Sequence, residues 1–194
     1  MELKGCHSRG YLPHFDSQDT IQFVTYRLAD SLPREALARI RTAAQPESLR
    51  DEMLDSGWGA CWLGQPDIAE LVENAFLAFD GRRYRLHAWT IMPNHVHVLA
   101  SSIAGVTLGS VVSSWKRFTA REANRQLGRI GAFWQDDYWD RFIRNEEHFF
   151  ATIDYIDHNP VKAGLVANAR LWPWGSARFN HDAPLEWRAP SKDS

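Results

Sequence analysis

The pattern of apolar and polar residues in the first part of the chain predicts a strand, then a helix, then an irregular stretch. From Thr20 to Ala29 (TIQFVTYRLA) the residues are apolar and β-branched with partial alternation, which predicts a strand ending at Asp30. Pro33 opens a segment of helical composition, because proline is favoured in the first turn of a helix. Between residues 46 and 65 the glycines and acidic residues show no period, and we expect an irregular insertion there.

The middle of the chain carries the strongest periodic signals. From Ile68 onward apolar residues recur at helical spacing, which predicts a helix with one buried stripe: Leu71, Val72, Ala75, Phe76 and Phe79. Two strands are predicted next, Tyr84 to Met92 and His95 to Ser102. Because the Pro93-Asn94 dipeptide between them favours a chain reversal, they should pair as a hairpin.

The second half of the chain predicts two further helices around a short strand. The first, from Leu108 to Leu127, has an apolar face formed by Leu108, Val111, Val112, Trp115 and Phe118. Tyr138 to Arg144 has the composition of a strand, and Asn145 is suited to cap a final helix. That helix should bury Phe149, Thr152, Ile153 and Ile156, end near Asn159 before Pro160, and be closed by Gly164.

This order of elements predicts an α+β fold with one antiparallel sheet and helices packed on one face. A length of 194 residues suits one domain, and we expect residues 180–194 to form a loosely held tail. The net charge is only −2, so contact with nucleic acid requires a local basic patch. No apolar run reaches the ~20 residues of a membrane span. Cys6 and Cys61 fit no zinc spacing. The cytoplasm is the expected location.

His95 and His97 are the first candidates for chemistry. Residues i and i+2 of a strand point to the same face, so the two imidazoles converge on one small volume. Neutral imidazoles can hold a divalent ion with coordination positions left for a substrate oxygen. A histidine pair of this kind also occurs on strands that have no catalytic role, so the pair alone does not define a metal site.

Tyr155 lies on the final helix at the border of its buried face, and Asn159 is one turn further on. A phenol with a reference pKa near ~10 is a poor nucleophile unless its developing charge is stabilised. Most helical tyrosines simply bury the ring and leave the hydroxyl in water. A phosphate backbone could be contacted by a set of cations, for each of which a solvated surface is an equally good explanation: Lys116, Arg117, Arg121, Arg125, Arg141, Arg144 and Lys162.

Taken together, these segments resemble the REP-associated tyrosine transposases, relatives of the single-stranded-DNA transposases of small insertion sequences. The resemblance runs from about Gly10 to about Phe179. It is carried by six blocks in order: RGYLPHF, IQFVTYRLADSLP, AWTIMPNHVHVL, SWKRFTAREANR, FWQDDYWDRFIRN and DYIDHNPVKAGLV.

The resemblance implies a ferredoxin-like sheet whose central strand carries the histidine pair. By that likeness His95 and His97 bind Mg²⁺ or Mn²⁺, and Tyr155 is the nucleophile. Relatives often take a third ligand from a glutamine one turn after the tyrosine, where this chain has Asn159. Asn159 could instead cap the helix end, with His148 and His158 as weaker substitutes, and Tyr138 is the rival nucleophile.

The expected function is that of a transposase that binds single-stranded or hairpin DNA of palindromic repeats, as a monomer or a homodimer. Cleavage would leave the 5′-phosphate esterified to Tyr155 and release a 3′-hydroxyl. Two other functions remain open at this point: a domesticated hairpin-binding protein that does not cleave, and a metal-dependent phosphoesterase that uses water, with Tyr155 structural.

Overall fold

A four-stranded antiparallel sheet in the order β4-β5-β3-β6 is the centre of the fold. The structure is a computed structural model that describes residues 5–8, 13–16, 20–103 and 105–179. Its strands are β1 (Gly5–Ser8), β2 (Pro13–Asp16), β3 (Ile21–Arg27), β4 (Tyr84–Ile91), β5 (His95–Ser102) and β6 (Trp139–Phe142). Its helices are α1 (Arg34–Thr42), α2 (Pro46–Asp55), α3 (Pro66–Leu77), α4 (Leu108–Gln126) and α5 (Glu146–Lys162), with 3-10 turns η1 (Trp62–Gly64), η2 (Ala169–Leu171) and η3 (Ser176–Phe179).

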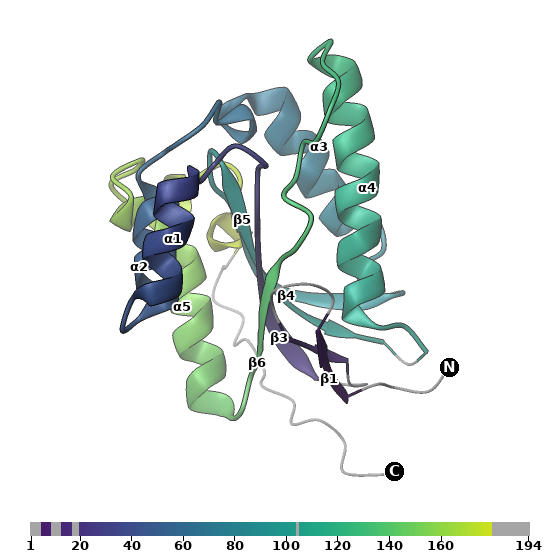
Figure 1. The fold of residues 1–194 in the computed structure, drawn as a ribbon. Helices are drawn as coiled ribbons and strands as arrows, with labels where there is room; N and C mark the ends of the chain where they lie inside the picture. Colours follow the sequence, from purple (N-terminus) through teal and green to yellow (C-terminus); the bar gives the residue numbers. More distant parts are fainter. Residues whose placement is uncertain (1–4, 9–12, 17–19, 104, 180–194) are drawn as a thin grey trace.

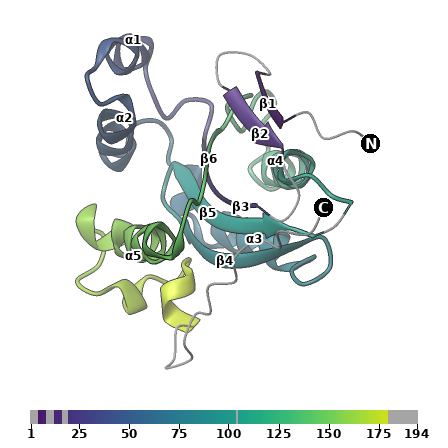
Figure 2. The same ribbon diagram turned by 90° about the horizontal axis from the view of Figure 1, so that it is seen from below.

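Helices cover both faces of this sheet, whereas the order of elements had predicted helices on one face (Figures 1 and 2). The expected helices on one face are α3 and α4, whose apolar stripes pack on the residues of β3 and β5 that point to that side. The C-terminal helix α5 packs on the opposite face, against Ile21, Phe23, Ala88 and Leu99. Because side chains alternate along a strand, each face of β5 belongs to a different layer.

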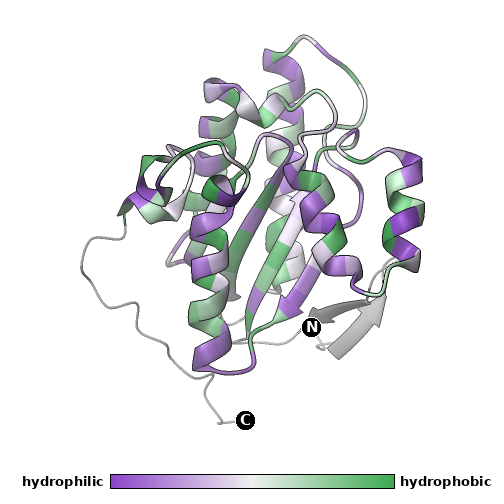
Figure 3. Cartoon of the chain, turned by 90° about the vertical axis from the view of Figure 1, so that its left-hand side faces the viewer, coloured by the Kyte–Doolittle hydropathy of each residue, from purple (hydrophilic) through white to green (hydrophobic). Residues whose placement is uncertain are grey.

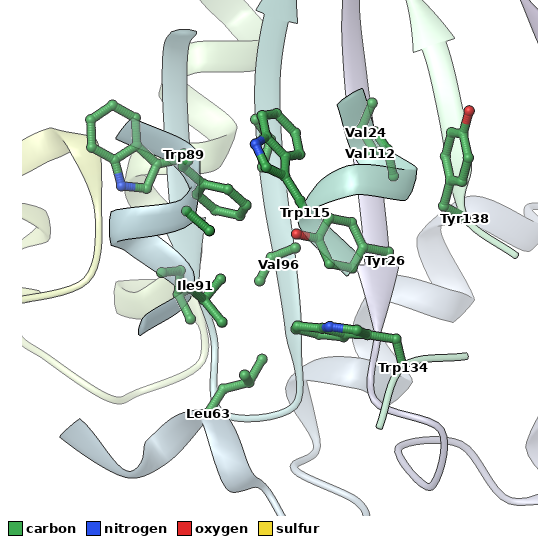
Figure 4. Close-up of a cluster of buried hydrophobic side chains, with 14 of the residues drawn as sticks. Val24, Tyr26, Leu63, Trp89, Ile91, Val96, Val112, Trp115, Trp134 and Tyr138 are labelled. Atoms are coloured by element: carbon green, nitrogen blue, oxygen red, sulfur yellow. The ribbon is translucent and has the colours of Figure 1, made fainter. Parts of the chain in front are cut away.

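The larger core lies between the sheet and helices α3 and α4 (Figure 4). Tyr26 is fully buried there, and its ring meets Trp134 edge to face at 4.8 Å. Trp115 of α4 packs edge to face on Phe76 and Tyr84, with both centroid distances at 4.9 Å. Its indole N–H donates to the Tyr84 hydroxyl, so these two buried polar atoms are paired.

Residues 46–65 were expected to be irregular, and the structure corrects this expectation. Residues 46–55 form helix α2, which starts with Pro46 in its first turn. Leu54 is buried in a small separate core with Ala36 and Ile40 of α1, flanked by Leu37, Leu49 and Met53. Figure 3 shows α1 and α2 with hydrophilic residues interspersed among their hydrophobic ones. The apolar stripe of α2 is short because it faces one neighbouring helix, and so it gave no clear period.

Three further expectations are corrected. Phe79 was placed in the buried stripe of the helix from Ile68, but it lies beyond the end of α3 and is 45% exposed. Phe118 was assigned to the apolar face of α4 but is 43% exposed, whereas the other assigned residues of that face are buried. The last helix does not end at Asn159: it continues through Pro160 to Lys162. Proline removes one backbone donor, and this costs little so close to the helix end, where Gly164 at φ +72° closes the turn as expected.

The remaining expected strands and helices of the described residues are present. β4 and β5 pair as the predicted hairpin, and the Asn145 side chain caps α5 by accepting from the His148 N–H. None of the described helices is both long and apolar enough to cross a membrane. The expected tail, residues 180–194, lies outside the described residues.

We predict that Phe76→Ala lowers the free energy of unfolding by about 3–5 kcal/mol, because its fully buried ring fills the space between α3, the sheet and Trp115. Phe79→Ala, at a 45% exposed phenylalanine just beyond α3, is the control and should change it by about 0.5 kcal/mol or less. Urea titration monitored by circular dichroism measures both. Equal losses would show that this interface is not the main core.

Candidate active site

His95 and His97 are the first and third residues of β5, and both side chains point to the face covered by α5. Both are completely buried, and their Nε2 atoms lie 3.1 Å apart. On the other side of each ring, Nδ1 has a partner: Asn94 Oδ1 for His95 and Thr25 Oγ1 for His97, each at 2.8 Å. The free edges of the two imidazoles are therefore directed at one another.

Asn94 fixes the orientation of the His95 ring. Its amide Nδ2 donates to the carbonyls of Leu54 and Trp58, at 3.1 and 3.0 Å. Its Oδ1 must therefore be the atom that faces His95, and the His95 Nδ1 carries the proton. This leaves the His95 Nε2 lone pair available to accept a proton or ligate a cation. Asn94 was predicted only as a turn residue, and its supporting role was not visible in the sequence.

Burial keeps both imidazoles neutral. It lowers the pKa of His95 well below the ordinary value, and the neighbouring His97 lowers it further. Burial also lowers the pKa of His97 to about 3, with Arg50 and Lys162 acting in the same direction. Neutral imidazole is the form that ligates metals, so the pair is held in that form throughout the physiological pH range.

Tyr155 lies on α5 directly over this pair. Its ring centroid is 5.4 Å from that of His97 and 5.8 Å from that of Phe23. The Tyr155 hydroxyl donates to Asp51 Oδ2 at 2.8 Å. Asp51 is itself held by Arg50, whose Nε and Nη2 lie 2.7 and 2.6 Å from Asp51 Oδ1. The tyrosine is thus anchored by a carboxylate whose own position is fixed by a two-pronged ion pair.

The hydroxyl of Tyr155 is protonated in this environment. Burial raises its pKa above the ordinary value of 10, and the negative charge of Asp51 raises it further. Arg50 acts in the opposite direction with a smaller effect. The phenol therefore requires both a proton acceptor and stabilisation of its developing charge before it can act as a nucleophile.

Helix α2 supplies site residues that were not found in the sequence. Asp51 and Asp55 are one turn apart on this helix. Asp51 accepts the hydrogen bond of Tyr155, and Asp55 forms a 3.2 Å ion pair with Lys162 of α5. The other oxygen of Asp55 lies 3.9 Å from His95 Nε2. The available signal was the i, i+4 spacing of the two aspartates after Pro46, which has meaning only once the segment is known to be a helix.

The residues around the pair fit a divalent cation. Asn159, one turn beyond Tyr155, is 1% exposed, and neither amide atom hydrogen bonds to the described residues. Asp55 Oδ1 is buried and likewise accepts no hydrogen bond there. Buried polar atoms normally have partners, so these point to a ligand. Within the described part of the chain no three His, Cys, Asp or Glu residues are arranged around a metal, and the Asn159 amide oxygen and Asp55 Oδ1 are the candidates for a third ligand.

The rival candidates lie elsewhere. Tyr138 is buried in the core on the opposite face of the sheet, beside Tyr26 and Trp134, and so does not face the imidazoles. His148 sits in the first turn of α5, where its Nδ1 accepts from the Arg144 N–H. His158 is exposed and pairs with Asp154 on the surface of α5.

The predicted DNA-contacting cations fall into two groups. On α4, Lys116 is committed to the carbonyls of Gln135 and Asp136 at 2.7 and 2.6 Å, and burial lowers its pKa to about 8. Arg121 and Arg125 both pair with Glu122, and Arg117 precedes them on the same helix. This helix covers the face of the sheet away from Tyr155.

The other group lies on the side of the sheet that carries the imidazoles. Arg141 of β6 pairs with Glu47 of α2 at 3.0 Å, and Lys162 of α5 pairs with Asp55. Arg144 lines a surface hollow with Arg141 and His148 at the start of α5. These three cations therefore lie on the same side of the sheet as the tyrosine, whereas the arginines of α4 belong to a second surface.

Residues 66–159 match the family described as "Transposase IS200 like", and this range contains both histidines, Tyr155 and Asn159. Over this range the chain is similar to these transposases. Among its relatives it is similar to the REP-associated tyrosine transposase of Escherichia coli (strain K12). The two are 29% identical over 120 residues, covering 58% of this chain and 67% of that protein.

A solved structure of a REP-associated tyrosine transposase bound to a REP hairpin has the same fold. The TM-score is 0.60 at 19% sequence identity, and the match covers 96% of this chain and 95% of that one. At this identity the likeness establishes the α+β architecture alone.

We predict that, in metal-free protein, Tyr155 titrates above pH 10, and that Asp51→Asn lowers its pKa without bringing it down to 10. The substitution removes the charge of Asp51, while burial, the larger cause, remains. NMR of protein labelled at tyrosine ¹³Cζ follows the titration, with the Tyr155 signal assigned by its loss in Tyr155→Phe. A Tyr155 pKa near 10, or one indifferent to Asp51→Asn, contradicts the prediction.

Proposed function

We propose that this chain is a single-stranded-DNA transposase that binds hairpins of palindromic repeats and cleaves and rejoins DNA through a 5′-phosphotyrosine at Tyr155. One observation carries the proposal: the tyrosine packs on His97, one of two buried imidazoles that converge, and its hydroxyl is hydrogen-bonded to a carboxylate. The family match and the likeness to a hairpin-bound relative support the DNA substrate. We expect it to act in the cytoplasm.

The chain's own residues account for the attack. Tyr155 Oη forms a bond to phosphorus, and its proton passes to Asp51, the acceptor of its hydrogen bond. The bond from phosphorus to the 3′ oxygen breaks, and that oxygen leaves as a 3′-hydroxyl after taking up a proton. The phosphodiester is replaced by a phosphotyrosine ester, so rejoining to another 3′-hydroxyl requires no external energy source.

We propose that His95, His97 and Asn159 hold Mg²⁺ or Mn²⁺. When bound, the ion supplies a Lewis acid that offsets negative charge on the phosphate oxygens. The two imidazoles contribute Nε2 lone pairs, and Asn159 contributes its unpaired amide oxygen. Asp55 adds a buried carboxylate beside His95, which favours a cation at this place over an anion.

The cations beside the tyrosine are placed to guide a strand. Arg141 and Lys162 are about half exposed and are held by single carboxylates, Glu47 and Asp55. The Arg141–Glu47 ion pair is exposed on both sides and contributes little stability, so a phosphate can take the place of the Glu47 carboxylate. We assign the strand next to the tyrosine to Arg141, Arg144 and Lys162, and more distant parts of a hairpin to Arg117, Arg121 and Arg125.

The decisive experiment uses labelled hairpin oligonucleotides with unpaired flanks, incubated with the protein and Mg²⁺ or Mn²⁺ and run on denaturing gels. We predict a slowly migrating covalent adduct that is lost in Tyr155→Phe and falls at least about a hundredfold in rate in His95→Ala or with EDTA. Tyr138→Phe is the matched control and should keep the adduct, because Tyr138 lies on the other face of the sheet.

The possible outcomes separate the alternatives. Cleavage that survives Tyr155→Phe without an adduct would replace the proposal with a phosphoesterase that uses water. Tight binding of hairpins with no cleavage under any metal would indicate a binding protein that no longer cuts. An adduct that persists in Tyr155→Phe but not in Tyr138→Phe would reverse the assignment of the nucleophile.

A further inference from the structure

Two adjoining cavities lie between helix α2 and the edge strand β6. One measures about 150 Å³ and the other about 550 Å³, and Glu47, Arg50 and Trp139 line both. We call the pair of cavities the Trp139 pocket. The larger one falls within the range of ~300–1,000 Å³ that is common for small-molecule sites.

The pocket adjoins the catalytic pair through two residues of β3. In the sheet, Thr25 pairs with His97 on one side and with Trp139 on the other, so the three side chains share a row and a face. Thr25 also contacts His97 Nδ1, and Phe23 stacks on the His97 ring at 5.4 Å. Phe23 and Thr25 both line the smaller cavity, which therefore begins where the imidazole site ends.

Trp139 is the centre of this pocket. It is partly exposed on β6, and the guanidinium of Arg50 lies 4.8 Å from its ring centroid. Arg50 is held there by Asp51, the same residue that accepts the Tyr155 hydrogen bond. Trp139 and Tyr155 are thus connected through Arg50 and Asp51. A ligand that packs on Trp139 is therefore held near Tyr155.

We propose that the Trp139 pocket holds one unpaired nucleotide adjacent to the phosphate that Tyr155 attacks. This inference rests on the proposed function, because it concerns the strand that the active site admits. The base stacks with the Trp139 indole, a contact that every base can make. The Arg141–Glu47 ion pair opens when the nucleotide binds. Arg141 then pairs with the nucleotide's phosphate, and Glu47 accepts a hydrogen bond from an amino group on the base edge.

The chemistry of the walls favours a nucleotide over an apolar ligand. Glu47 and Arg141 are 64% and 46% exposed at the side chain and pair across the smaller cavity, so the mouth is charged. An aromatic surface beside guanidinium groups is the usual arrangement for an unpaired base with its phosphate. A lipid or an apolar peptide would take this charged pair out of water without offering either group a new partner.

Affinity for abasic probes tests the proposal. The probe is a DNA hairpin with unpaired flanks on both sides, made as a series with one abasic position at a time. Binding is measured in the Tyr155→Phe background, which cannot be consumed by cleavage, with and without Trp139→Leu. The matched control is Phe79→Leu, an exposed aromatic residue that also lies beside an arginine, Arg83, away from the site.

We expect one unpaired position at which the abasic change weakens binding about tenfold. Trp139→Leu should weaken binding of the intact probe by a similar factor and remove the abasic penalty at that position alone, whereas Phe79→Leu should leave it unchanged. If the losses of affinity caused by Trp139→Leu and by the abasic change are additive at every position, the proposed pocket is wrong. The proposed hairpin binding and cleavage by Tyr155 would still stand. Absence of binding to any hairpin would overturn both the pocket and the proposed function.

A second measurement leaves the pocket residues unaltered, in case Trp139→Leu does not fold. Probes carrying 5-iododeoxyuridine at each unpaired position are photo-crosslinked to the Tyr155→Phe protein, and the adduct is located by mass spectrometry. We expect the position identified by the abasic series to crosslink to the peptide containing Trp139. Crosslinks at other peptides only would contradict the proposal.

Discussion

The pairing register of β3 with its two neighbours determines which side chains meet under α5. Thr25 lies opposite His97 on β5 and Trp139 on β6, and Phe23 lies opposite Leu99 and Arg141. A slip of one residue would turn both histidines into the core formed with α3 and α4. On that other face Tyr26 of β3 packs edge to face on Trp134 within an aromatic cluster. Such a slip is costly because it would take Tyr26 out of this cluster. The core on one face thus fixes the chemistry on the other.

The electrostatics of the site follow from burial. Removing the two imidazoles from water keeps them neutral, and removing Tyr155 keeps it protonated. Helix α2 then places Asp51 and Asp55 over the same region, and each contacts α5. The two neutral imidazoles thus lie beside the unpaired Asp55 Oδ1, while Arg50 and Lys162 pair with other oxygens of the two carboxylates. We propose that a divalent cation and a phosphate together complete this site.

The sequence predicted the sheet, its helices and the histidine pair because these depend on periods of two and 3.6 that local residues repeat. The choice of Tyr155 over Tyr138 as the nucleophile came from the family resemblance, and the two tyrosines lie on opposite faces of the sheet. The sequence analysis missed Asp51, Asp55 and Arg50, because their meaning depends on how a short helix docks on α5. It also placed Lys116 among the DNA contacts, although the carbonyls that surround its ammonium come from a loop about twenty residues away in the chain.

The central claim is that the buried face under Tyr155 is a cation site, and crystals grown with Mn²⁺ test it most directly. Anomalous scattering should place one ion within about 2.3 Å of the Nε2 atoms of both histidines and close to the Asn159 amide oxygen. The peak should disappear in His97→Gln and persist in Tyr155→Phe. Mn²⁺ bound only at surface carboxylates, with the two imidazoles still in direct contact, would contradict the account.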